Sequence, residues 1–177
     1  LEFRRVLFRS GPLYRMSNHT CYQVGFAGVA CGIARSALDN FVDVARNKVP
    51  RGMKTTLRDN AVVQSGLAQA EVSLRAARAF LLQSMADIWK DLVAGHSITV
   101  AQRMTIRMAA THAIHKAREA VDFAYSTAGA TAIFDGHPLE RRFRDIHTVT
   151  QQLQGRLSHF ETVGAWMLGV DADLSFV

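Results

Sequence analysis

The stretch that decides the fold is residues 128–156, AGATAIFDGHPLERRFRDIHTVTQQLQGR. It opens with three small residues, Ala128, Gly129 and Ala130, and a His-Pro pair follows at 137–138. Glycine is the residue that most often ends a helix, and proline suits the first helical turn. The order therefore predicts that one long helix ends near Gly129 and that the last helix begins at Pro138.

Outward from this stretch, apolar residues recur every three or four positions over most of the chain, which is the helical period. The pattern predicts four helices, near residues 21–47, 57–94, 99–129 and 138–168. Pro50, Gly52, Gly95 and Gly129 separate them, and Gly155 is a point where the last helix can bend or break. Because no segment alternates with period two for long, the predicted fold is all-α, an antiparallel four-helix bundle.

The composition of the chain indicates which partners and which cellular compartment to expect. The 177 residues carry a net charge of +6, but the basic residues are scattered among acidic ones, which argues against a nucleic-acid partner. The uncharged run at residues 16–34 contains Asn18, His19 and Gln23, so it predicts a buried helix and no membrane span. Cys21 and Cys31 would lie about 15 Å apart along a helix, too far for a disulfide, and both are predicted to be buried. Nothing suggests secretion, so a cytoplasmic location is expected.

The first residues differ from the rest. The segment LEFRRVLFRS at 1–10 is basic and does not continue the pattern that follows, nor does it have the small-residue cleavage site of a signal peptide. We interpret residues 1–15 as a non-native or linker segment. Residues 16–177 are then one helical domain.

Three segments resemble the C-terminal domain of the acyl-CoA dehydrogenase family. GFAGVACGIARSALDNFVDVARNK (25–48) is similar to its first helix, AVVQSGLAQAEVSLRAARAFL (61–81) to its second, and HPLERRFRDIH (137–147) to the entry of its last. The nearest branch is that of two-component flavin-dependent monooxygenases, which act on aromatic or sulfur compounds. True acyl-CoA dehydrogenases are the other branch. The resemblance implies a reduced flavin, FAD or FMN, and a flavin reductase as a partner. It also implies a homotetramer, N-terminal and middle domains that this chain lacks, and no activity of the chain alone.

The resemblance also implies candidate site residues. In the family, a Gln-x-x-Gly-Gly turn touches the flavin nucleotide of a neighbouring subunit, and the matching residues here are Ser126, Gly129 and Ala130. The alternative for Gly129 is a plain helix cap. Many dehydrogenases of the family carry a Glu-Gly pair after the Arg-Asp step, and its Glu takes the substrate proton. Gln154 stands before Gly155 here, and an amide is not a useful base, which argues against dehydrogenation.

A monooxygenase needs a hydrogen-bond donor or base beside the flavin, and histidine can serve. His147 is the first catalytic candidate and His159 the second; the alternative for each is a structural role on the helix surface or between subunits. His112 and His115 lack an accompanying cysteine or acid, so no metal site is predicted. Two other functions stay open for the whole chain: a fragment of a true acyl-CoA dehydrogenase, and a helical interaction module without chemistry.

Overall fold

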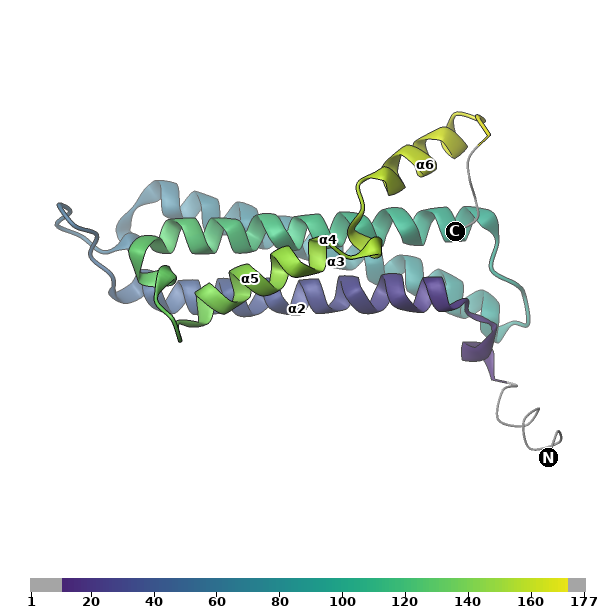
Figure 1. Cartoon of the computed structure of the whole chain (residues 1–177), viewed down its shortest axis with the longest axis horizontal. Helices are drawn as coiled ribbons and strands as arrows, with labels where there is room; N and C mark the ends of the chain where they lie inside the picture. The colour runs from purple at the N-terminus through teal and green to yellow at the C-terminus, as the bar shows by residue number, and fades with distance from the viewer. Residues whose placement is uncertain (1–10, 172–177) are drawn as a thin grey trace.

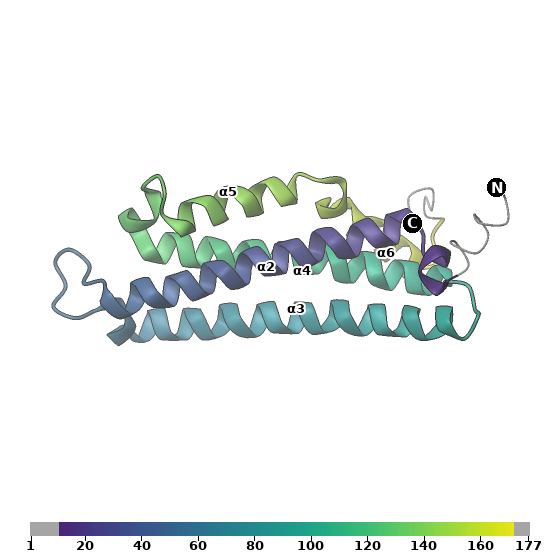
Figure 2. The same cartoon turned by 90° about the horizontal axis from the view of Figure 1, so that it is seen from below.

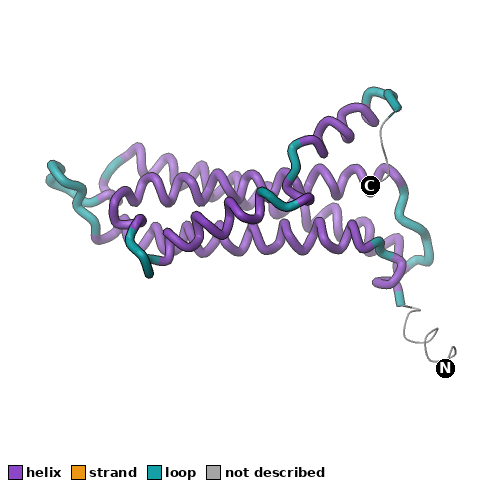
Figure 3. The backbone as a smooth tube through the Cα atoms, in the orientation of Figure 1, coloured by secondary structure: helices purple, strands orange, loops and turns teal. Residues whose placement is uncertain are grey.

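The computed structural model describes residues 11–171, and within them every regular element is helical (Figure 3). Four long or medium helices follow one another: α2 (Asn18–Asn47), α3 (Ala61–Val93), α4 (Val100–Ala128) and α5 (Pro138–Thr150). Short 3-10 turns precede or connect them: η1 (Pro12–Arg15), η2 (Leu57–Asp59), η3 (Gly129–Ile133) and η4 (Leu153–Gly155). The last helix is α6 (Ser158–Met167). The predicted all-α fold is confirmed.

Successive helices run in opposite directions, as a four-helix bundle requires (Figures 1 and 2). Helices α2 and α4 form the central pair; α3 covers one side of it and α5 the other (Figure 2). The centre is built largely from alanines that are at most 1% exposed, which lets α2 and α4 approach closely. These are Ala27, Ala30, Ala34 and Ala37 on α2 and Ala109, Ala110, Ala113, Ala117, Ala120 and Ala124 on α4.

Local signals set most helix ends where the sequence predicted them. Thr99 forms a capping box with Gln102 at the start of α4, and Gly129 ends that helix with a φ of +60°. Pro138 occupies the first turn of α5 behind His137, whose side chain accepts a hydrogen bond from the Leu139 N–H. Ser17 caps α2 in the same way. These caps satisfy backbone groups that helix ends otherwise leave unpaired.

Four details differ from the sequence prediction. The helix predicted at 57–94 begins at Ala61, after the 3-10 turn η2. The helix predicted at 138–168 is broken at Gly155, the possible break point that the sequence indicated, and it ends short of residue 168. Helix α5 ends at Thr150, η4 intervenes, and α6 leaves the bundle at an angle (Figure 1). Cys31 is buried but Cys21 is exposed.

The fourth difference concerns the glycines of α2. Gly25, Gly28 and Gly32 follow one stripe of this helix, and such small residues predict close packing of a neighbouring helix. A Cβ built at any of the three would meet nothing within 4 Å. All three glycines are exposed, and Gly28 and Gly32 line an open groove between α2 and α3. The alanine stripe, not the glycine stripe, lies in the core.

No helix within residues 11–171 combines the length and the apolar character that a membrane span needs. The interpretation of residues 1–15 as a foreign or linker segment falls mostly on 1–10, which lie outside the described residues, while Pro12–Arg15 form η1.

Candidate functional site

The turn after α4 brings the predicted cofactor residues together. The N–H of Gly129 donates a hydrogen bond to the Ser126 carbonyl, which closes the last turn of α4. Ser126, Gly129 and Ala130 are all exposed, whereas Ala128 and Ala132 on either side are fully buried and anchor the turn. Gly129 has a backbone conformation that residues with a side chain rarely adopt. The result is a fixed turn with open backbone, which fits contact with a ligand and equally fits a helix cap.

Lys48 reaches the same turn from the end of α2, which the sequence did not indicate. Its ammonium group donates hydrogen bonds to the carbonyl of Ala128 and to Oγ1 of Thr131, the latter at 2.8 Å. A positive charge at the carboxyl end of a helix is favourable because that end carries partial negative charge. Eighty residues separate Lys48 from Ala128, so no local pattern could have shown this contact.

His147 lies on α5 and is held by two neighbours. Its Nε2–H donates to Asp122 Oδ1 on α4 at 2.9 Å, since a carboxylate can only accept. The imidazole also rests on Phe143, with ring centroids 4.4 Å apart, and Phe143 stacks on Tyr125 at 4.3 Å. The side chain is half-buried, with 41% of its surface exposed. An oriented imidazole paired with a carboxylate can donate or accept a proton at its exposed face.

His159, by contrast, is only 6% exposed. Its Nδ1 shares a hydrogen bond of 2.9 Å with Thr111 Oγ1, inside α4. The pKa of His159 is lowered to about 4, mainly by burial and also by the charges of Arg107 and Arg156. The imidazole is therefore neutral at neutral pH, and its contacts tie α6 to α4.

The two histidines do not form one site. Their partners Asp122 and Thr111 are eleven residues apart on α4, which is about 16 Å along a helix. His147 lies towards the end of α4 that carries the Gly129 turn, and His159 lies at the break in the last helix.

The break itself is the place where the family's base was expected. Gln154 is buried, and its carbonyl lies 3.5 Å from Thr111 Oγ1, which donates towards it. The Nε2–H of His115 donates to the Gly155 carbonyl at 2.8 Å. A Cβ at Gly155 would lie 2.8 Å from the Thr150 carbonyl oxygen, so the turn requires glycine. The contact from Thr111 therefore fixes the backbone of this turn, and Gln154 is buried at the position before Gly155.

Histidines 112 and 115 are not brought together as metal ligands. The Nε2–H of His115 is hydrogen-bonded to the Gly155 carbonyl. The pKa of His112 is lowered, mainly by burial and also by the charge of Lys116. Within residues 11–171 no group of three or more His, Cys, Asp or Glu side chains could hold a metal ion.

The charged residues near the start of α5 form ion pairs with one another. They are Glu140, Arg141, Arg142, Arg144 and Asp145. Arg144 donates two hydrogen bonds to the Glu140 carboxylate. Its Nε bonds to Oε1, and its Nη2 bonds to Oε2 at 2.9 Å. Arg142 bonds to Asp145 at 3.1 Å and to Ser36 Oγ on α2 at 3.0 Å. The last contact fixes α5 against the central pair.

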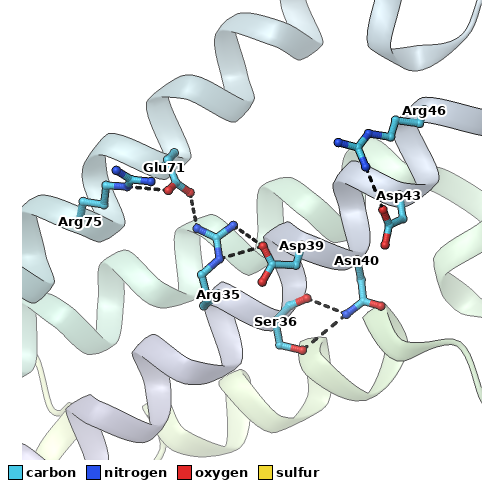
Figure 4. A network of polar contacts seen from close by, with 8 residues as sticks. All are labelled: Arg35, Ser36, Asp39, Asn40, Asp43, Arg46, Glu71 and Arg75. Carbon is cyan, nitrogen blue, oxygen red and sulfur yellow. Dashed lines mark hydrogen bonds and ion pairs between the residues drawn. The ribbon is translucent and has the colours of Figure 1, made fainter.

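A second charge network, centred on Arg35, bridges α2 and α3 (Figure 4). Arg35 contacts Asp39 Oδ1 at 2.8 Å and also bonds to Glu71, to which Arg75 donates at 2.6 Å. The hydrogen bond from Arg35 is the main reason that the pKa of Glu71 is lowered. Arg35 therefore binds carboxylates of its own chain.

The family model for the acyl-CoA dehydrogenase C-terminal domain matches residues 24–154. The chain therefore belongs to the acyl-CoA dehydrogenase family and is its C-terminal helical domain, as the resemblance predicted. Among curated relatives, it is 33% identical over 158 residues to the indole-3-acetate monooxygenase of Pseudomonas putida, covering 89% of this chain and 41% of that protein. It is 31% identical over 147 residues to the oxygenase component of p-hydroxyphenylacetate 3-hydroxylase from Acinetobacter baumannii, covering 80% and 33%.

Solved structures agree on the fold. The 3-HSA hydroxylase from Rhodococcus sp. RHA1 superposes with a TM-score of 0.86 at 24% identity, over 97% of this chain and 44% of that one. XiaF from Streptomyces sp., solved in complex with FADH2 and glycerol, gives a TM-score of 0.86 at 21% identity, over 92% and 42%. The chain thus spans about two fifths of the length of these proteins.

Proposed function

We propose that this chain is the C-terminal domain of the oxygenase component of a flavin-dependent monooxygenase. The observation that carries the proposal is its similarity, over most of its length, to monooxygenases and a hydroxylase. One of these relatives is the flavin-dependent monooxygenase oxygenase subunit HsaA of Rhodococcus jostii, at 27% identity over 139 residues. The N-terminal and middle domains of the full-length protein would supply the rest of the active site. The chain alone would be inactive.

The buried amide of Gln154 supports oxygenation over dehydrogenation. Removal of a proton from an acyl-CoA thioester needs a base, and an amide cannot act as one near neutral pH. His147 is the better-placed catalytic group in this chain because it is oriented by Asp122 and keeps an exposed edge. We propose that it donates a hydrogen bond to, or takes a proton from, the reacting groups. His159, buried and neutral, is the second candidate and would act from within the fold.

The cofactor we propose is reduced FAD or FMN, supplied by a flavin reductase in the cytoplasm. When bound, it supplies the electrons that activate oxygen. The turn at Ser126, Gly129 and Ala130 fits contact with the nucleotide part of the flavin, because its backbone is exposed and Gly129 carries no side chain to block approach. By the family resemblance, that flavin would belong to a neighbouring subunit.

We also propose that the full-length protein is a homotetramer, as the family resemblance implies. Exposed apolar side chains support this proposal. Near the end of α6, Trp166 is 38% exposed, Met167 67% and Leu168 82%. Contiguous exposed apolar surface of this kind marks interaction sites. Light scattering on the full-length protein should give the mass of four subunits. A monodisperse monomer would contradict the proposal.

The substrate we propose is an aromatic compound, on the strength of the relatives' names. The test is oxygen uptake and product analysis with the full-length protein, flavin and an NADH-driven flavin reductase. Substrates would be indole-3-acetate, p-hydroxyphenylacetate, sulfur compounds and acyl-CoA thioesters. We expect an oxygenated product from an aromatic compound. Transfer of electrons from an acyl-CoA to an artificial acceptor would establish the dehydrogenase alternative instead, and failure to bind any flavin would leave a helical interaction module.

A further inference from the structure

Lys48 lies where three segments of the chain meet. Its backbone N–H donates to the Val44 carbonyl at the end of α2, and its own carbonyl accepts from the Leu57 N–H, both at 2.9 Å. Its side chain bonds to the Ala128 carbonyl and to Thr131 in η3. Because backbone contacts already fix Lys48, its side chain is not needed to end α2 or to close the loop at 49–56. The side chain instead binds the two segments on either side of Gly129.

The ammonium group also changes the charge that the turn presents. The carboxyl end of a helix is equivalent to about −0.5 elementary charge and would repel a phosphate group. Lys48 places a full positive charge at this end, and a Cβ on Gly129 would lie only 3.5 Å from its Nζ. Gly129 and Ala130 are exposed beside it. An anion that approaches this backbone therefore meets a positive field in place of a negative one.

We propose that Lys48 is a positioning residue for the phosphate-bearing part of the flavin. It holds the Gly129 turn in one conformation and neutralises the end of α4, so that a nucleotide phosphate can lie against the exposed backbone. The inference rests on the proposed function, because it assumes that the full-length protein binds flavin. It adds a residue that the family resemblance did not supply.

The test compares three flavins that differ in phosphate content: riboflavin, FMN and FAD. Their dissociation constants are measured by fluorescence titration with the full-length protein and its variants. Lys48→Met removes the charge and both hydrogen bonds, and Lys48→Arg keeps the charge. Lys54→Met is the matched control, because Lys54 is an exposed lysine in the neighbouring loop.

We expect Lys48→Met to bind FMN and FAD about 3–30-fold more weakly, the range for a charge placed at a helix end. Riboflavin binding should not change. Lys48→Arg should retain most of the affinity, and Lys54→Met all of it. Added salt should narrow the gap between wild type and Lys48→Met, because it screens the charge.

Two results would overturn the inference. If Lys48→Met weakens all three flavins equally, the lysine only supports the fold; if it weakens none, the lysine has no part in binding. A wild-type protein that binds no flavin would instead refute the proposed function. If Lys48→Met does not fold, as judged by circular dichroism, Lys48→Gln removes the charge but keeps donors. The same phosphate-dependent loss is then expected, and its absence overturns the inference.

Discussion

Replacing Gly155 with alanine should destabilise the break between α5 and α6. The added Cβ would lie 2.8 Å from the carbonyl oxygen of Thr150, 3.1 Å from its Cα and 3.2 Å from its carbonyl carbon. All three atoms belong to backbone, so they cannot move aside as a flexible side chain could. The turn must shift, and with it the Gly155 carbonyl that accepts from His115.

The size of the effect can be worked from these contacts. Inserting a methyl group into a packed site costs about 1–3 kcal/mol, and a weakened hydrogen bond to His115 costs about 1 kcal/mol more. Against this, alanine has a less flexible unfolded state than glycine, which contributes about 0.4–1 kcal/mol of stability. The net loss should be about 1–3 kcal/mol in the free energy of unfolding. For a chain of this size, each kcal/mol lowers the melting temperature by roughly 2–4 °C.

The matched control is Gly164→Ala. A Cβ at Gly164, inside α6, meets nothing within 4 Å, and alanine is the better helix former by about 1 kcal/mol. Urea unfolding of the 177-residue chain, followed by far-UV circular dichroism, should therefore show opposite shifts for the two variants. Equal midpoints, or a more stable Gly155→Ala, would refute the reasoning that glycine is required at this turn.

Three further changes test other parts of the fold and the site. The pKa of His159 is lowered from 6.5 to about 4, so its contribution to stability is complete above pH 6.5 and is lost as the pH falls towards 4. His159→Asn should flatten that part of a pH profile of urea unfolding. His147→Ala in the full-length protein should slow oxygen-dependent product formation by about 10²–10⁴ and change the flavin dissociation constant less; unchanged turnover and peroxide release would make His147 structural. Thr99→Ala removes a capping box and should cost about 1 kcal/mol in thermal unfolding, whereas Thr105→Ala, within the same helix, should be nearly neutral.

Signals carried by neighbouring residues were enough to predict the helices and the family. The cap at Thr99, the stop at Gly129 and the start at Pro138 each depend on a side chain and the backbone within a few residues of it. Helical periodicity is equally local, which is why the all-α class could be read directly. The candidate turn at Ser126, Gly129 and Ala130 came from the resemblance to the family's Gln-x-x-Gly-Gly turn, and its contact with flavin stays a prediction.

The choice between two stripes on α2 needed the tertiary structure. Ala27, Ala30 and Ala34 follow one helical stripe, and Gly25, Gly28 and Gly32 follow another. Both consist of small residues that permit close packing, so composition alone does not say which one faces α4. In the packed bundle the alanine stripe is the one that is buried. The same orientation of α2 leaves Cys21 exposed and Cys31 buried.

The partners of the site residues were likewise decided by contacts between distant parts of the chain. Gly155 marks the point where the last helix can break, but the sequence did not show that His115, forty residues away, bonds to the turn there. His147 meets Asp122 across 25 residues, and Lys48 meets Ala128 across 80. The sequence by itself determined the all-α fold, most of the helix ends and the family. Only the tertiary structure decided which side chains meet, because a hydrogen bond between helices depends on how the helices pack and leaves no periodic trace in the sequence.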